Sequence, residues 1–200
     1  RINMQIESIF PIPLLRVDNF INEAQCADIL AHCKENAELT YHGCLPRNAM
    51  STHHTHGDIL QDISLSLDSL SAMHYNIAST LNEYAKECRL PPLRITESWV
   101  NFQDKDSVLI DHTHPNSKVS GVLYIQTDEY SSPLYFENPN PFVHFELYSM
   151  PDIYSGTTFR VEPTNGTLLL FPSWLRHGSR HEQSESDSRV AISLNSWEIE

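Results

Sequence analysis

Residues 111–125, DHTHPNSKVSGVLYI, join an H-x-H pair to an apolar run with the composition of a β-strand. A second segment much later in the chain, GTLLLFPSWLRH at residues 166–177, has another strand-like run and ends on a single histidine. These histidines can meet only if their two strands are neighbours, as strands are in a small β-barrel. The two segments therefore predict a β-rich fold that gathers His112, His114 and His177 at one corner.

The rest of the chain divides into a helical first part and a β-rich second part. Residues 23–36 carry apolar side chains at helical spacing, and Asn22 can cap that helix. A longer apolar stripe runs from Leu67 to Cys88, and the Pro-broken residues 9–17 suit an edge strand. Later segments rich in Val, Ile, Tyr, Phe and Thr predict strands at residues 94–103, 108–111, 119–127, 134–137, 142–147, 158–161, 167–171 and 189–197.

This pattern predicts an α+β fold that is mainly β. We expect a double-stranded β-helix, or jelly roll, in residues 94–200. The helices and the edge strand of residues 1–93 are expected to support it, with the helices packed on one sheet. Residues 1–200 are then one domain, a size at which a single chain buries a substantial core.

Composition excludes several classes of protein. The formal net charge of −13 makes nucleic acid an improbable partner, because phosphates require a basic face. No apolar run reaches the length of a membrane span, so no membrane association is expected. The four cysteines have no C-x-x-C spacing, which favours a reduced, cytoplasmic protein. The oligomeric state is left open, with a homodimer among the alternatives.

The histidine spacing also carries chemistry. In an extended segment, alternate side chains share one face, so His112 and His114 point the same way. A third imidazole from a neighbouring strand, His177, would complete one face of a metal and leave the opposite face open. Open positions distinguish a catalytic metal site from a structural one. Imidazoles suit iron, zinc, copper and nickel alike, so they do not fix which metal binds.

These segments, followed by Arg189, resemble the non-haem Fe(II)/2-oxoglutarate-dependent oxygenases. More narrowly, they resemble a group of oxygenases often met in phage and marine bacterial genomes. The resemblance covers roughly residues 96–198, about half of the chain. It implies Fe(II) as the cofactor, with another divalent metal present in purified protein as an alternative, and 2-oxoglutarate as the co-substrate. The implied reaction hydroxylates a substrate, a small molecule or a protein, that the sequence does not identify.

The chain departs from the family at the third metal ligand. The family pattern usually has a carboxylate two residues after the first histidine, where this chain has His114. In the favoured arrangement His114 is the ligand. In the alternatives, Asp111 or Glu137 supplies a carboxylate, or His114 lies outside the coordination sphere. With three imidazole ligands, metal binding near pH 6 is expected to be coupled to about three histidine titrations.

The resemblance implies that Arg189 binds the distal carboxylate of 2-oxoglutarate, as a guanidinium can hold a carboxylate through two hydrogen bonds. The hydroxyl that the family has two residues later is replaced by Ala191. We expect Tyr124 to supply a hydroxyl instead. Asn101, on the preceding strand, is expected to contact the end of the co-substrate nearer the metal.

Aromatic residues and a histidine-rich loop are candidates for the substrate entrance. Trp99 and Trp174 flank the predicted ligand segments, and His56 lies in the loop STHHTHG at residues 51–57. The three histidines of this loop are a possible second metal site, but a loop over the mouth of the active site fits its polar composition better.

Two other functions remain compatible with the sequence. One is a three-His, cupin-like dioxygenase or isomerase that does not use 2-oxoglutarate. The other is a non-catalytic jelly roll that binds a sugar or a partner protein, because this fold hosts many functions. A buried Arg189 opposite the metal discriminates between the oxygenase and the cupin-like enzyme. The non-catalytic jelly roll instead predicts no stoichiometric iron and no turnover of 2-oxoglutarate.

Overall fold

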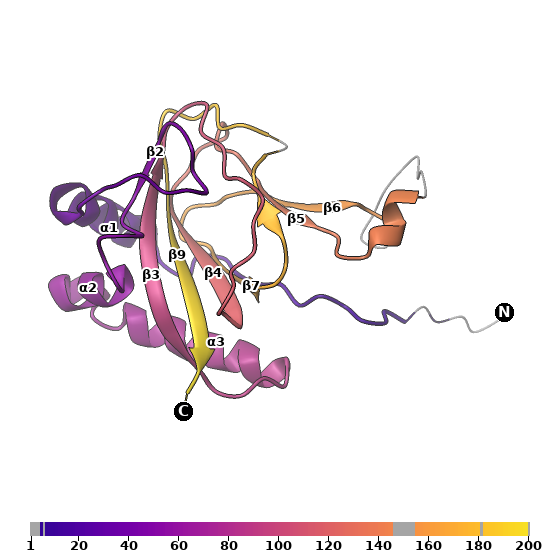
Figure 1. Cartoon of the computed structure of the whole chain (residues 1–200). Helices are drawn as coiled ribbons and strands as arrows, with labels where there is room; N and C mark the ends of the chain where they lie inside the picture. The colour runs from indigo at the N-terminus through magenta and orange to yellow at the C-terminus, as the bar shows by residue number, and fades with distance from the viewer. Residues whose placement is uncertain (1–4, 6, 146–154, 181, 200) are drawn as a thin grey trace.

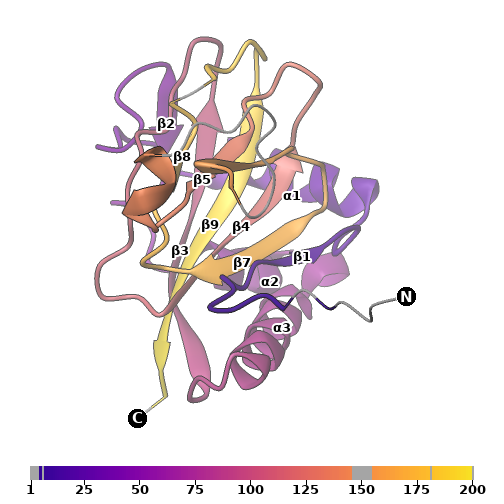
Figure 2. The same ribbon diagram turned by 90° about the vertical axis from the view of Figure 1, so that its right-hand side faces the viewer.

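The computed structural model describes residues 5, 7–145, 155–180 and 182–199. Its strands form two antiparallel sheets that face each other (Figures 1 and 2). The larger sheet has the order β1-β7-β4-β9-β3-β2. Its strands are β1 (Leu15–Val17), β2 (Ala49–Ser51), β3 (Leu93–Gln103), β4 (Val119–Gln126), β7 (Leu168–Pro172) and β9 (Arg189–Glu198). The smaller sheet has the order β6-β5-β8, with β5 (Leu134–Glu137), β6 (Thr158–Val161) and β8 (His177–Gly178).

Three α-helices cover the face of the larger sheet that is turned away from the smaller one (Figure 1). They are α1 (Glu23–Asn36), α2 (Ile59–Ser66) and α3 (Met73–Glu87). Helix α1 begins at a capping box, in which the Asn22 side chain accepts from the Gln25 backbone and the Gln25 side chain accepts from the Asn22 backbone. The expected mainly β fold, with helices packed on one sheet of a jelly roll, is confirmed.

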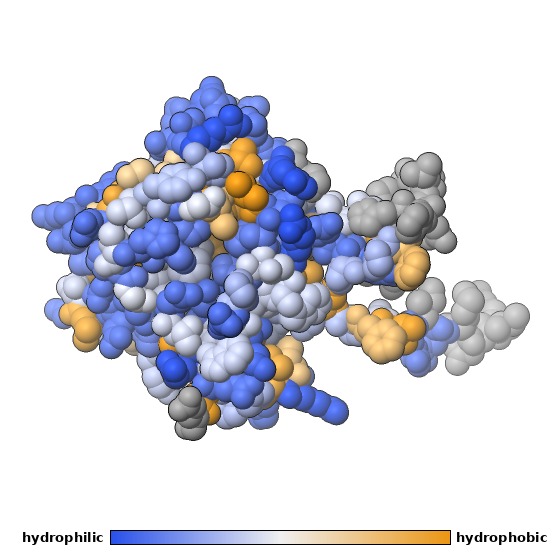
Figure 3. Space-filling view, viewed as in Figure 1, coloured by the Kyte–Doolittle hydropathy of each residue, from blue (hydrophilic) through white to orange (hydrophobic). Residues whose placement is uncertain are grey.

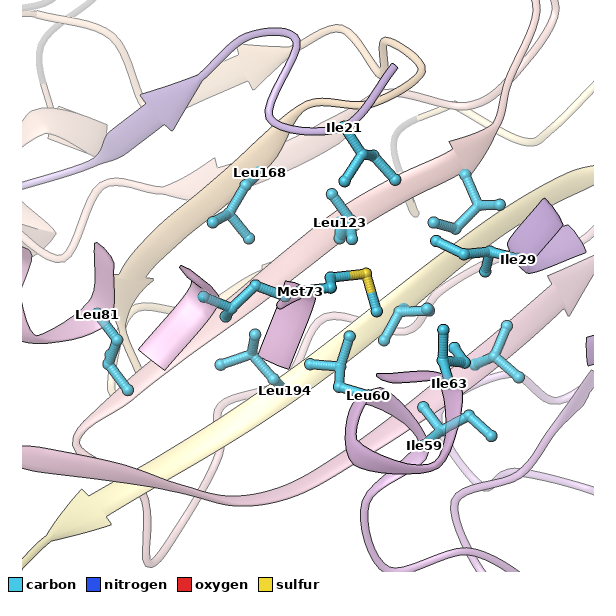
Figure 4. Packing of buried hydrophobic residues seen from close by; sticks show 14 of the residues in the cluster. Ile21, Ile29, Ile59, Leu60, Ile63, Met73, Leu81, Leu123, Leu168 and Leu194 are labelled. Atoms are coloured by element: carbon cyan, nitrogen blue, oxygen red, sulfur yellow. The ribbon is translucent and has the colours of Figure 1, made fainter. Parts of the chain in front are cut away.

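The larger sheet is buried on both faces, and each face has its own apolar cluster. Alternate residues of β4 divide between them: Leu123 points to the helices, whereas Val122 and Tyr124 point to the smaller sheet. Figure 4 shows the helix-side cluster, which includes Ile21, Ile29, Ile59, Leu60, Ile63, Met73, Leu81, Leu123, Leu168 and Leu194. The face turned to the smaller sheet is the floor on which the candidate site lies.

The exterior agrees with the strongly acidic composition. Most of the face in Figure 3 is hydrophilic, and its apolar residues form separate small groups. None of the helices in the described part of the chain has both the length and the apolar character needed to cross a membrane.

Several predicted elements need correction. The stripe from Leu67 to Cys88 is not one helix, because the extended backbone of Leu67 ends α2 and a 3-10 turn, Asp68–Leu70, precedes α3. Residues 108–111 form no strand. The backbone N–H groups of Leu109 and Ile110 donate to the Ser179 hydroxyl and the Cys44 carbonyl instead of to a sheet.

A second expected strand is also replaced. Residues 141–145 form a 3-10 helix, Pro141–Phe145, and residues 146 and 147 lie outside the described part of the chain. Helix α2 and the short strands β2 and β8 were not predicted. The expected edge strand at residues 9–17 contracts to β1, which pairs with β7 at the edge of the larger sheet.

Candidate metal centre

The three predicted ligands meet between the two sheets. An isolated antiparallel bridge joins His112 to His177: the N–H of each residue donates to the carbonyl of the other, at 2.9 and 3.0 Å. The N–H of His114 donates to the carbonyl of Ser173 at 3.0 Å, just after β7. Backbone pairing, and not a loop alone, therefore fixes the positions of all three histidines.

Their rings are close enough to share one ion. The centroid of the His112 ring lies 4.8 Å from that of the His114 ring and 4.6 Å from that of the His177 ring. The Nε2 atoms of His114 and His177 are 3.3 Å apart. Two nitrogens each about 2.1 Å from one metal ion at a right angle are separated by about 3 Å. One candidate ligand atom from each histidine lies within 4.8 Å of the others, so this cluster can bind a metal.

Hydrogen bonds also orient two of the rings for coordination. Nδ1 of His112 lies 2.7 Å from the carbonyl of Ile110, and Nδ1 of His177 lies 2.8 Å from the carbonyl of Leu175. A carbonyl only accepts, so Nδ1 carries the proton and the Nε2 lone pair remains available for a metal.

No carboxylate of the described residues joins this cluster. Asp111 forms an ion pair with Arg180 at 2.9 Å, and its carboxylate occupies the space that a Cβ of residue 178 would take. Glu137 forms an ion pair with Arg176 at 2.9 Å. Both acidic candidates are therefore engaged elsewhere, and the structure provides an all-imidazole donor set.

Burial keeps these imidazoles neutral. Loss of solvation, reinforced by the neighbouring histidines, lowers the pKa of His114 to about 3 and that of His177 to about 3. Burial also lowers the pKa of His112. In the folded protein His114 and His177 are therefore deprotonated near pH 6, so fewer than the expected three histidine titrations should accompany metal binding.

The same shifts link stability to pH. In the unfolded chain these histidines titrate near the ordinary value of about 6.5. Because the pKa of His177 is lower in the folded protein, the unfolded state binds more protons than the folded state once the pH falls below about 6.5. The contribution of neutral His177 is complete above about pH 6.5 and is lost as the pH falls toward about 3, by up to about 1.4 kcal/mol per pH unit.

A cavity that is partly open to solvent connects the three histidines to Arg189. The Arg189 side chain is 5% exposed, and its guanidinium lies 5.3 Å from the centre of the Tyr124 ring. Its Nη1 donates to the Gln103 side chain, while its Nε has no partner among the described residues. No carboxylate of the described residues pairs with this buried cation.

The sheet register places the other two co-substrate candidates beside the arginine. Ala191 pairs with Asn101 on β3 and with Tyr124 on β4, so these three residues form one row across the floor of the cavity. The Asn101 amide donates to Ser193, but its Oδ1 has no partner among the described residues. The Tyr124 hydroxyl is buried beside the Arg189 guanidinium, and its own proton has no acceptor among the described residues. Burial raises the pKa of Tyr124, so its hydroxyl stays protonated and can donate.

The entrance candidates fare differently. Trp99 is buried in the cavity wall, with its ring 6.0 Å from that of His114. Trp174 is 56% exposed and is not among the residues that line the cavity, and neither is His56.

Part of the histidine-rich loop does reach the site, through His53, whose ring packs edge-on against Trp99 at 4.7 Å. The loop histidines do not form a second cluster of metal-ligand atoms within the described residues.

Sequence reasoning missed two residues of this cavity. His42 lines it, is buried, and has an Nδ1 atom without a partner in the described part of the chain. Burial lowers the pKa of His42 to about 4. Gln103 is the direct partner of Arg189. A single histidine in a turn and a glutamine at the end of a strand carry no local signal, although the pairing of β3 with β9 would have located Gln103.

Comparison with known proteins agrees with this geometry. A family model described as "Putative 2OG-Fe(II) oxygenase" matches residues 97–195, which include all three histidines and Arg189. The chain belongs to this family. It is a Fe(II)/2-oxoglutarate-dependent oxygenase, an oxidoreductase, and its histidine cluster fits the iron that the family uses. No curated protein matches the sequence.

Solved structures with low sequence identity share the fold of this oxygenase. HygX from Streptomyces hygroscopicus, solved with nickel, 2-oxoglutarate and hygromycin B, superposes with a TM-score of 0.61 at 14% identity, covering 94% of this chain and 84% of that one. A 2OG-Fe(II) oxygenase-family oxidoreductase from Burkholderia pseudomallei gives 0.65 at 11% identity, covering 92% and 84%. A prolyl-4-hydroxylase from Pseudomonas putida gives 0.57 at 13% identity, covering 94% of both chains.

The neutral triad predicts the proton balance of metal binding. Three imidazoles with an ordinary pKa would release about two protons per metal ion at pH 6. The lowered pKa values of His114 and His177 predict a smaller release, because these two imidazoles have no proton to lose at that pH. Calorimetric titration with Ni(II) at pH 6, in two buffers of different ionisation enthalpy, counts the protons. A release of two or more would contradict the neutral site.

Gly178 allows the ligand segments to approach each other. A Cβ atom there would meet the Asp111 carboxylate and would lie 2.8 Å from the carbonyl of Leu109. Gly178→Ala should displace the segment that carries His112 and weaken Ni(II) binding about ten- to a hundredfold, as expected when a ligand loses its orientation. Gly57→Ala is the matched control, because a Cβ at Gly57 meets nothing within 4 Å. Equal Ni(II) affinity in both variants would show that this close approach does not position the ligand.

Proposed function

We propose that this oxygenase hydroxylates a C–H bond of its substrate, with His112, His114 and His177 binding Fe(II) and Arg189 binding 2-oxoglutarate. One observation carries the proposal: a buried guanidinium without a carboxylate partner shares a cavity with a cluster of metal-binding histidines. An unpaired buried charge is costly, so this position calls for an anionic ligand.

The residues fit both groups that the family uses. The three imidazole nitrogens are suitable ligand atoms for a divalent iron. When bound, that iron together with 2-oxoglutarate and dioxygen would supply the oxidation of the C–H bond. Arg189 has unused donors for the distal carboxylate of the co-substrate, and the Tyr124 hydroxyl adds another. Asn101 lies on the row between Arg189 and the histidines, a position from which it can contact the end of the co-substrate nearer the metal.

The chain's own contribution is to bind, orient and shield. The fixed Nδ1–H bonds of His112 and His177 hold two ligand rings before any metal arrives, which lowers the reorganisation needed for binding. Phe171 packs edge-on against His177 at 4.7 Å, and Trp99 packs beside His114. These rings cover one side of the three imidazoles and would exclude water there, so that the cavity is the side left open to ligands.

The substrate side of the cavity is formed by His42 and Trp99, with His53 behind them. His42 is neutral and has an unpaired Nδ1, so this wall offers hydrogen bonding and aromatic contact without a charge. We assign this wall to the primary substrate, a small molecule or a protein segment. The proteins with this fold include both kinds, since HygX was solved with hygromycin B and a prolyl hydroxylase from Trichoplax adhaerens was solved with a peptide fragment.

The cellular setting belongs to the same proposal. The cysteines Cys26, Cys33, Cys44 and Cys88 are all free, which supports a reduced, cytoplasmic environment. The net charge of −13 argues against nucleic acid as the substrate. A three-His enzyme without 2-oxoglutarate is the weaker alternative, because it has no use for the unpaired Arg189 at the far end of the cavity.

Substitution of Arg189 separates co-substrate binding from metal binding. Arg189→Ala should weaken 2-oxoglutarate binding at least about a hundredfold, because the buried carboxylate loses its charged partner, while Ni(II) affinity stays nearly unchanged. Arg189→Lys should recover only part of the loss, since an ammonium cannot offer two parallel donors. Calorimetric titration of Ni(II)-loaded protein with 2-oxoglutarate measures both effects.

Arg176→Ala is the matched control, because Arg176 pairs with Glu137 outside the cavity lining. It should bind 2-oxoglutarate as the wild type does. Equal 2-oxoglutarate affinity in the wild type and Arg189→Ala would remove the co-substrate assignment and favour the three-His alternative.

A further inference from the structure

The end of the cavity that contains Arg189 has a second polar residue with an unused donor. Gln103 pairs with Arg189 in the register of β3 and β9, and its Oε1 accepts a hydrogen bond from Nη1 of the arginine. A guanidinium has donors only, so the amide must turn its oxygen toward Arg189. The Gln103 Nε2 group is then turned away from Nη1 of Arg189. It is buried, and it has no partner among the described residues.

Three unpaired donors therefore gather around one end of the cavity. They are the Nε2 of Gln103, the Nε of Arg189 and the hydroxyl of Tyr124, on residues that are at least 95% buried and that all line the same space. Buried donors are paired in nearly all folded proteins, so a shared set of this kind indicates a ligand with several acceptors. A carboxylate has two oxygens and about four acceptor sites, enough to receive all three donors.

The surrounding row explains why this chain needs an additional donor. Ala191 occupies the position where the resembling family has a hydroxyl, and its methyl group cannot donate. Tyr124 pairs with Ala191 from β4. On β3, Gln103 lies two residues beyond the partner of Ala191 and pairs with Arg189. The strands on both sides of β9 thus supply the donors of Gln103 and Tyr124, whereas Arg189 lies on β9 itself.

We propose that Gln103 binds the distal carboxylate of the co-substrate through its Nε2 donor and helps select a 2-oxo diacid over a 2-oxo monoacid. In this arrangement Gln103 and Tyr124 together replace the hydroxyl that is absent at Ala191. The Gln103 amide has two contacts, one to the guanidinium through oxygen and one to the ligand through nitrogen. This assignment rests on the proposed binding of 2-oxoglutarate by Arg189.

Ligand pairs test the assignment. In Ni(II)-loaded protein, Gln103→Met should weaken 2-oxoglutarate binding about ten- to a hundredfold, since a hydrogen bond to a charged group is lost. The affinity for 2-oxopentanoate, which has the same carbon chain but no distal carboxylate, should stay within about twofold of the wild-type value. Gln126→Met is the matched control: Gln126 lies on β4 outside the cavity lining, and its amide donates to the Ser188 carbonyl. It should bind both acids as the wild type does.

A spectroscopic measurement keeps the test independent of how well the variants fold. The side-chain amide protons of Gln103 in Zn(II)-loaded wild-type protein should shift downfield on addition of 2-oxoglutarate and should not do so with 2-oxopentanoate. A Gln103 amide that responds equally to both acids, or equal 2-oxoglutarate affinity in the wild type and Gln103→Met, would overturn the role of Gln103 and leave the function of Arg189 intact. Failure of the wild type to bind 2-oxoglutarate would overturn the proposed function, and this inference with it.

Discussion

The antiparallel bridge between His112 and His177 is the contact on which the site depends. It joins a segment just before β4 to the short strand β8, and β8 in turn pairs with β5 in the smaller sheet. The bridge therefore links the strand-end region of the larger sheet to the sheet that faces it. The backbone N–H and carbonyl groups of both residues form the bridge, and each Nδ1 atom donates to the carbonyl two residues before it. Nε2 is therefore the ring atom available to a metal. Fold and donor geometry are fixed by the same hydrogen bonds.

Charge distinguishes this centre from the usual two-His, one-carboxylate pattern of the family. Its candidate ligands are three imidazoles, and the two acidic candidates near them are paired with Arg180 and Arg176. With Arg189 at the other end, the cavity has cationic and neutral groups but no compensating carboxylate in the described part of the chain. Such a cavity favours an anionic ligand that spans it, and a 2-oxo diacid has a charge at each end.

The sequence was sufficient where the signal was local or strongly periodic. The apolar spacing and the Asn22 cap predicted α1 with its observed bounds. Short apolar and aromatic segments between turn residues located β3, β4, β5, β6, β7 and β9 within two residues at each end. His112 and His114 were found because alternate side chains of an extended segment share one face, and His177 was found because it follows a second strand-like run.

Other features depend on contacts between distant segments. Residues 108–111 have the composition of a strand, but their backbone groups bond to Ser179 and Cys44, which no local pattern reveals. The role of Gln103 follows only from its register opposite Arg189. The turn that carries His42 is closed by a hydrogen bond from the Leu45 N–H to the His42 carbonyl. The Ile110 N–H donates to the Cys44 carbonyl in the same turn, so contacts with a distant segment also set the position of His42.

The central claim is that one cavity binds iron through three histidines and 2-oxoglutarate through Arg189 at the same time. Anaerobic titration of the metal-free protein with Fe(II), followed by 2-oxoglutarate, tests it most directly through visible absorption. A metal-to-ligand charge-transfer band requires the 2-oxo acid to coordinate the bound iron. The account predicts that the band saturates at one Fe(II) and one 2-oxoglutarate per chain and is absent in His177→Ala. Saturable Fe(II) binding with no band on addition of 2-oxoglutarate would contradict it.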